Sequence, residues 1–292
     1  MEQKLFSKNF TLVVIGQIIS LFGNATIRFA LPLYLLNQTG SSTLFGTVTA
    51  CAFLPAILLT PVGGIVADRV NKRNIMVILD FFTAAVIAAF SILSGGVNLI
   101  LLIVVTLMLL YGIAGAYQPA VQASIPALVS TGHIMEANSV VNIISSLAAL
   151  SGPVLGGILY SNYGLKPVLW VCTLCFILSA VMELFIKIPF QRQESGGGVW
   201  KIVKKDFAES IQFIRRDKPA IGKTVSVVCG VNLFLSAMIL VGLPYLVTEV
   251  MFDKAGYDSD YVNKLYGYAQ GALAAGSLAG GIGAGVLVKK LK

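Results

Sequence analysis

The chain has 292 residues, of which 57% are hydrophobic and only 12% are charged, and its formal net charge is +8. A soluble domain carries about a quarter charged residues, so this composition excludes an ordinary soluble enzyme. The mean hydropathy is +0.85, and the 29 glycines are typical of membrane helices, in which glycine allows two backbones to approach closely. The composition predicts a multi-pass α-helical membrane protein.

Long uncharged runs mark the expected membrane-crossing helices. A bilayer core of about 30 Å needs roughly 20 mainly apolar residues per helix. Arg28 is the only charged residue between Phe10 and Ala67, and no Lys, Arg, Asp or Glu lies between Asp80 and Glu136. The runs predict eight crossings, near residues 10–36, 43–67, 75–94, 98–127, 134–160, 166–188, 220–250 and 261–288.

The basic residues indicate the orientation of these helices. Short cytoplasmic loops hold an excess of Lys and Arg. Four segments hold 17 of the 21 basic residues: the amino terminus, the loop from Arg69 to Arg73, the long loop from Lys187 to Lys223, and the carboxyl end. We therefore expect both termini to be cytoplasmic in a cell membrane. Because the basic residues flank helix ends, we expect no nucleic-acid partner.

The sequence offers no clear enzyme site. Cys172 and Cys175 have the spacing of a metal or redox pair, but they lie in an apolar run without a second pair, which favours a role in helix packing. The single histidine, His133, lies in a predicted loop. No Ser/His/Asp set or phosphate-binding loop is recognisable. We expect no enzymatic activity, no metal and no cofactor.

A polar stretch divides the chain into three parts. Residues 1–188 form a predicted six-helix bundle, residues 189–219 a cytoplasmic linker, and residues 220–292 two further helices. Apolar residues recur in the linker at steps of three and four, which predicts an amphipathic helix that is either a solvated linker or lies among anionic lipid headgroups. These apolar residues are Trp200, Val203, Phe207, Ile211 and Ile214.

The two helical parts are related by a weak internal repeat. At an offset of 221 residues, Leu44-Phe45-Gly46 aligns with Leu265-Tyr266-Gly267. Leu31-Pro32 corresponds similarly to Leu243-Pro244. Repeated halves joined by a long cytoplasmic loop are a transporter plan, so the repeat favours a transport function.

Two longer motifs occur in this arrangement, and on them the chain resembles the major facilitator superfamily. The stretch GGIVADRVNKR, from Gly63 to Arg73, is similar to the superfamily's signature loop, and Gly152-Pro153 with Gly156-Gly157 is similar to the antiporter signature of helix five. The smaller motifs Gln118-Pro119-Ala120 and Ala137-Asn138-Ser139 resemble the drug:proton antiporters of the macrolide-efflux type. The resemblance implies an all-α membrane protein with a six-helix amino-terminal bundle and the first two helices of a second bundle.

The resemblance also implies roles for the motif residues. Gly64, Asp68, Arg69 and Arg73 belong to the signature loop, in which Asp68 is expected to hold the two halves together on the cytoplasmic side. Solvated helix-end charges are the alternative for Asp68 and Arg69. In the helix-five motif, the spacing of Gly152 and Gly156 permits close helix contact and Pro153 permits a bend, so packing alone could also explain the motif.

Polar residues inside the predicted helices indicate a cavity. Gln17, Ser20, Asn24 and Arg28 follow one another at steps of three and four, so they share one helix face, and polar groups in a bilayer usually face the bundle interior. Arg28 could instead extend to the outer headgroups. Further cavity-facing candidates are Tyr111, Asn142 and Asn232, with interhelical hydrogen bonds as the alternative.

Two acidic residues lie in the membrane helices. Asp80 is predicted either to carry a proton or to pair structurally with Arg69 or Arg73. Glu183 is predicted to extend toward the cytoplasmic surface.

The leading functional hypothesis is a proton-coupled exporter of amphipathic drugs or similar small organic molecules, working by alternating access. A full superfamily member has twelve helices, so the resemblance implies that this chain is truncated after its eighth. The alternative is therefore a truncated, non-transporting membrane remnant or a membrane-embedded partner protein. The expected partners are a small-molecule substrate, protons and the lipid bilayer, with self-association or a separate polypeptide supplying the missing helices.

Overall fold

The amino-terminal part is a bundle of six long helices. A computed structural model describes residues 5–188, 209, 211–247 and 258–290, and none of the described residues is in a strand. A 3-10 turn, η1 (Thr131–His133), leads into the fifth long helix. The six helices confirm the predicted runs to within a few residues: α1 (Lys8–Thr39), α2 (Ser42–Arg69), α3 (Lys72–Leu93), α4 (Leu99–Leu128), α5 (Ile134–Tyr163) and α6 (Leu165–Leu184).

The first four helices begin at capping residues. The Ser7 hydroxyl accepts a hydrogen bond from the Phe10 amide at 3.2 Å, and Ser41, Asn71 and Asn98 cap α2, α3 and α4 in the same way. A capping oxygen satisfies one of the free amides of the first turn. α1 ends at Gly40, whose φ of 62° is left-handed and favours glycine. These caps fix the helix ends and keep the connections short.

The second part of the chain differs from the sequence-based prediction. One helix was predicted over residues 220–250, but α8 (Pro219–Ala237) gives way to a π-helical turn, η3 (Met238–Gly242). A π-helical turn, η2 (Phe213–Asp217), precedes α8, and α9 (Ser259–Lys290) follows. Pro219 occupies the first turn of α8, where its missing amide has no helical partner to lose. The predicted amphipathic helix lies largely outside the described residues.

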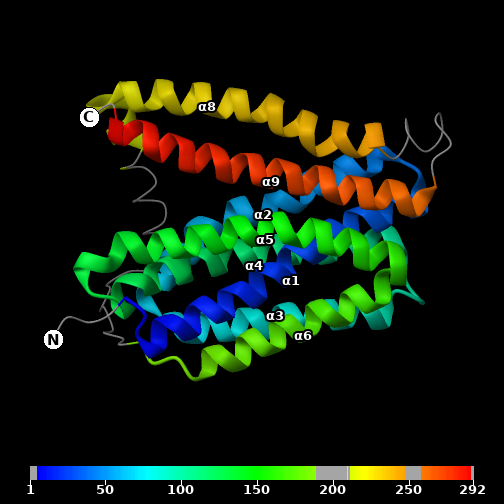
Figure 1. The fold of residues 1–292 in the computed structure, drawn as a ribbon, viewed down its shortest axis with the longest axis horizontal. Coiled ribbons are helices and arrows are strands. Elements are labelled where there is room, and N and C mark those ends of the chain that lie inside the picture. The colour runs from blue at the N-terminus through cyan, green and yellow to red at the C-terminus, as the bar shows by residue number, and fades with distance from the viewer. Residues whose placement is uncertain (1–4, 189–208, 210, 248–257, 291–292) are drawn as a thin grey trace.

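Most of the described basic residues lie near helix termini at one end of the molecule. α1 begins, α2 ends and α9 ends on the left of Figure 1. The loop with Arg69, Lys72 and Arg73 and the start of α8 lie at the same end. We refer to it as the basic end. The first and last described helices therefore have their outer termini on the same side of the bundle.

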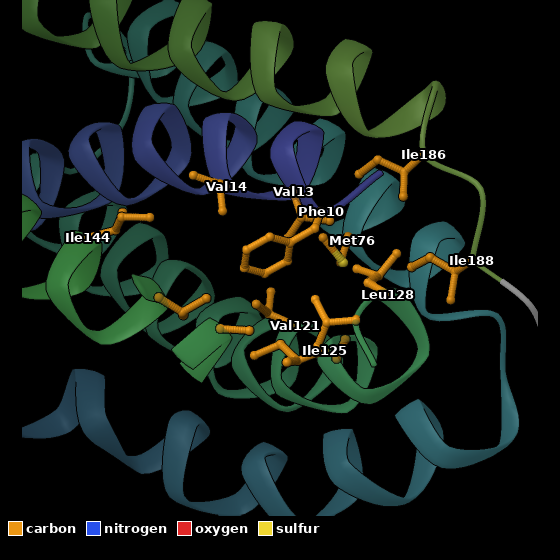
Figure 2. Packing of buried hydrophobic residues seen from close by; sticks show 14 of the residues in the cluster. Phe10, Val13, Val14, Met76, Val121, Ile125, Leu128, Ile144, Ile186 and Ile188 are labelled. Carbon is orange, nitrogen blue, oxygen red and sulfur yellow. The ribbon is translucent and has the colours of Figure 1, made fainter. Parts of the chain in front are cut away.

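α1 lies at the centre of the bundle and packs against α4, α5 and α6. α2 packs on α4, α3 packs between α4 and α6, and α5 packs on α9 (Figure 1). The buried apolar side chains form two clusters in this bundle. Figure 2 shows the cluster near the basic end, in which Phe10, Met76 and Leu128 meet. The second cluster lies toward the opposite end and contains Ile27, Ile87, Leu107 and Phe176, among others.

Large apolar side chains cover the outside of the helices. Leu58 is 71% exposed and Phe234 is 78% exposed, and such residues recur on α2, α3, α6 and α8. A soluble monomer rarely exposes continuous apolar surface of this kind, whereas lipid covers it in a membrane. Among the described residues, seven helices are both long and apolar enough to cross a membrane. The eighth predicted crossing corresponds to α9, whose 32 residues are more than long enough but include seven glycines.

Candidate functional site

A layer of buried polar side chains separates the two apolar clusters. It lies between them along the four helices that meet there. α1 and α4 supply neutral polar groups, whereas α3 and α6 each supply a carboxyl group. The buried members are Gln17, Ser20, Asp80, Thr83, Tyr117, Ser179 and Glu183.

Tyr117 connects this layer across three helices. The Gln17 side-chain amide donates a hydrogen bond to the Tyr117 hydroxyl at 2.7 Å, and that hydroxyl donates to Glu183 Oε1, also at 2.7 Å. All three side chains are buried. The tyrosine therefore uses both its acceptor and its donor capacity to link α1 to α6 through α4.

Asp80 brings a second carboxyl group to the same layer. It is 2% exposed and lies close enough to Tyr117 and Glu183 for electrostatic interaction. Asp80 Oδ2 and Glu183 Oε2 have no hydrogen-bond partner among the described residues. Two buried carboxyl groups thus share one site, and each has an oxygen atom with capacity to spare.

A small internal cavity lies beside Asp80. Its volume is about 20 Å³, which is enough for one water molecule. Ser20, Asn24, Tyr117 and Gln118 line it together with Asp80. The cavity therefore joins the polar face of α1 to α4. The shared face that the sequence predicts for Gln17, Asn24 and their neighbours is turned toward α4.

The prediction that Glu183 extends to the membrane surface is wrong. Its side chain is fully buried, because it points into the bundle and accepts the hydrogen bond from Tyr117 of α4. Arg73 lies at that end and donates hydrogen bonds to the backbone carbonyls of Glu183, at 3.3 Å, and of Leu184. No ion pair between Asp80 and Arg69 or Arg73 is present in the described part of the chain. The contact of His133 with Glu136 is an ion pair only when His133 is protonated.

Arg28 and Tyr111 form a second polar contact between α1 and α4, farther from the basic end. The guanidinium carbon lies 3.9 Å from the centre of the Tyr111 ring, and Nη2 donates to the Leu110 carbonyl at 3.0 Å. Phe53 of α2 packs edge-on against Tyr111 at 4.7 Å between ring centres. Arg28 Nε has no partner, and no carboxylate pairs with Arg28 among the described residues.

The helix-five motif lies in two helix contacts. A Cβ atom at Gly152 would lie 2.3 Å from Ala25 Cβ, so α1 occupies the space that any side chain there would need. On the adjacent face of α5, the carbonyl of Pro153 and Gly157 face Gly267 of α9. Gly156 packs against Thr26 of α1. The motif therefore packs α5 against the amino-terminal helix on one side and against the second half of the chain on the other.

The remaining predicted site residues are not brought together. No neighbour lies within 4 Å of a Cβ built at Gly64, and Arg69 is half-buried. The Asp68 side chain lies outside the described part of the structure. Asn142 and Asn232 are exposed, and the Asn232 amide donates to the Val228 carbonyl of its own helix at 2.9 Å.

The sequence analysis missed the central member of the buried layer, Tyr117. A signal was present, because α1, α3 and α4 each carry a polar residue about two to three turns from their basic ends. Periodicity within one helix cannot show which helices are neighbours. The proximity of Asp80 and Glu183 follows only from the packing of α3 against α6, which the sequence does not show.

The comparisons with known proteins agree with this architecture. A family model described as Major Facilitator Superfamily matches residues 13–292. Macrolide efflux protein A of Streptococcus pyogenes is 25% identical over 60% of this chain and 43% of its own length. The multidrug efflux pump Tap of Mycobacterium tuberculosis is 22% identical over 94% of this chain and 65% of its own.

The lysophospholipid transporter LplT of Photorhabdus laumondii is 26% identical over 75% of this chain and 53% of its own length. The matched region thus spans between 43% and 65% of the length of these relatives.

Proposed function

The chain belongs to the major facilitator superfamily, and from that premise we propose that it is a proton-coupled exporter of amphipathic small organic molecules. The superfamily consists of membrane transporters, and the chain is a multi-pass membrane protein with the corresponding helical fold. Three relatives are named for macrolide efflux, multidrug efflux and lysophospholipid transport, which supports small organic substrates. The single observation that carries proton coupling is the buried carboxyl pair of Asp80 and Glu183.

The proposed orientation places the basic end in the cytoplasm of the cell. Arg69, Lys72 and Arg73 lie at that end, together with the start of α8 and the end of α9. Positively charged loops are retained on the cytoplasmic side during membrane insertion. Both termini are then cytoplasmic, and the short turn at Gly40 and Ser41 is external.

Arg28 and Tyr111 support a charge preference for the substrate. An arginine without a carboxylate partner in a low-dielectric site repels cations and attracts anions. The guanidinium is held against the Tyr111 ring, and its Nε has hydrogen-bonding capacity to spare. We therefore assign neutral or anionic amphipathic molecules as substrates. Phe53 and the Tyr111 ring offer an aromatic surface for the apolar part.

Dye accumulation in cells of the native host tests this proposal. Cells with the gene intact and cells with the gene deleted are loaded with two fluorescent amphipathic dyes of similar size, one anionic and one cationic. We expect deletion to raise the accumulation of the anionic dye several-fold and to leave the cationic dye unchanged. If each dye accumulates to the same level with and without the gene, the exporter assignment is overturned and a non-transporting membrane partner is favoured.

A further inference from the structure

We propose that Asp80 and Glu183 form one proton-binding site that holds a single proton between two carboxyl groups. This inference deepens the proposed proton-coupled export and rests on that function only for its biological use. The site lies entirely within the amino-terminal bundle, where α3, α4 and α6 meet α1.

Both carboxyl groups are shielded from water. Glu183 is 0% exposed and Asp80 is 2% exposed. An isolated ionised carboxylate in such surroundings is strongly unfavourable unless a cation or several donors compensate for the lost hydration. Two neighbouring carboxylates would add mutual repulsion to that cost. A single shared proton removes the repulsion and leaves one buried charge in place of two, because the protonated group is neutral and can donate toward the other.

The groups that face the pair supply no positive charge. α1 contributes Gln17 and Ser20, and α4 contributes the hydroxyl of Tyr117. Arg73 lies at this end of α3, and it donates to the backbone carbonyls at the end of α6. Its charge is therefore directed at the helix terminus and not at a carboxylate.

Tyr117 leaves one oxygen atom of Glu183 available for the proton. Its hydroxyl donates to Glu183 Oε1 and accepts from Gln17, so it is already engaged both as a donor and as an acceptor. Glu183 Oε2 and Asp80 Oδ2 remain without partners in the described structure. These are the two oxygen atoms that we assign to the proton. The reaction is a simple protonation, in which a proton from water neutralises one of the two carboxylates.

The cavity beside Asp80 gives the proton a way toward the polar face of α1. Its volume of about 20 Å³ accommodates one water molecule. Asn24 and Gln118 line the cavity together with Asp80, whereas Glu183 does not. A water molecule bridging Asp80 to these amides connects the carboxyl pair to the face of α1 that continues to Arg28. Proton occupancy and substrate binding would then be coupled along one helix.

Infrared spectroscopy of the purified chain tests the site without requiring transport. A protonated carboxyl group has a carbonyl band that an ionised one lacks, so the band is followed while pH is raised. We expect the wild-type chain to show a carboxylic-acid band that disappears on alkalinisation. The double variant Asp80→Asn with Glu183→Gln should lose it, and a pH-indicator dye should register one bound proton fewer per chain. Glu136→Gln, which removes an exposed carboxyl group of α5, is the matched control.

Two further variants keep the test decisive if the double variant does not fold. Tyr117→Phe leaves both carboxyl groups in place and removes one donor, so the band should persist at a shifted frequency. Asp80→Asn alone should change the titration midpoint of the remaining group. An unchanged band in both single variants, or a wild-type chain without a titrating band, overturns the proposal. If the wild-type chain shows the titrating band but does not export the dye, only the exporter assignment is rejected. If it exports the dye but lacks the band, only the proton site is rejected.

Discussion

The side chain of Tyr117 illustrates how a polar residue is accommodated in the middle of a membrane bundle. Hydrocarbon offers no hydrogen-bond partners, so a buried hydroxyl must find its donor and its acceptor inside the protein. Tyr117 accepts from Gln17 and donates to Glu183, each at 2.7 Å. One hydroxyl therefore satisfies groups on two other helices, and its removal affects all three.

Replacing Tyr117 with phenylalanine should destabilise the bundle. The ring is retained, but the Gln17 amide and Glu183 Oε1 each lose a partner, and an unsatisfied buried polar group costs about 1–3 kcal/mol. We expect a lower midpoint of thermal unfolding in detergent. Tyr163→Phe is the control, because Tyr163 is 69% exposed at the end of α5. Equal midpoints for the two variants would show that the buried hydrogen bonds contribute nothing to stability.

Replacing Arg28 with glutamine should weaken export of anionic substrates. A hydrogen bond to a charged group is worth about 1.5–3 kcal/mol, which corresponds to roughly a ten-fold or larger loss of apparent affinity. Concentration-dependent export of the anionic dye from native host cells measures this loss. Lys166→Gln, an exposed charge at the start of α6, should leave export unchanged. Unaltered anion export by the Arg28 variant, at normal protein level, argues against a substrate role for Arg28.

At the scale of the helices, α5 is in close contact with a neighbouring helix on two sides. It packs against α1 through Gly152 and Gly156, and against α9 through Gly157. Small residues allow this double contact because they let the backbones approach closely. α5 thus connects the amino-terminal bundle to the second half, as expected of an element at the interface between two moving halves.

Adding a methyl group at Gly152 should disrupt this contact. The new Cβ would lie 2.3 Å from Ala25 Cβ, so α1 and α5 would have to separate. Overpacking of this kind costs about 1–3 kcal/mol. We expect Gly152→Ala to lower the unfolding midpoint, although alanine is the better helix former. Gly230→Ala in α8, where nothing lies within 4 Å of the new Cβ, should not lower it. The same midpoint for both alanine variants would contradict close packing at Gly152.

The sequence predicts where each helix begins and ends better than it predicts which helices pack together. The spans of α1 to α6 follow from uncharged runs bounded by Ser, Asn and Gly residues, which are local signals. The π-helical turn at Met238 has no comparable local signal, and a continuous apolar run was therefore taken for one helix. Glu183 lies one residue from the end of α6, so its position suggested exposure. Its burial depends on the contact of α6 with Tyr117 of α4, which is a property of the packed bundle.

At the scale of the whole molecule, the described contacts between α1 and α9 lie toward the end opposite the basic end. Phe29 of α1 stacks on Tyr266 of α9 at 5.0 Å between ring centres. Asn37 donates to Asn263 at 3.2 Å and to Tyr160 of α5, also at 3.2 Å. With the basic end in the cytoplasm, these contacts close the external side. Alternating access then requires them to separate in each transport cycle.

Linking Asn37 to Asn263 should therefore stop transport. We expect the variant Asn37→Cys with Asn263→Cys, with the four native cysteines replaced by alanine, to react with a short bismaleimide and to lose export of the anionic dye. Each single-cysteine variant, treated in the same way, should retain export. Continued export by the linked double variant would show that the external side need not open between α1 and α9.

Substrate-driven proton movement in inverted membrane vesicles of the native host tests proton-coupled export most directly. A fluorescent amine reports an imposed pH gradient while the anionic amphipathic substrate is added. Vesicles that contain the wild-type chain should lose part of the gradient on addition, because substrate and protons move in opposite directions. Vesicles with Glu183→Gln, or without the gene, should keep the gradient. The same loss of gradient in vesicles without the gene, or no loss with the wild-type chain, would contradict proton-coupled export by this protein.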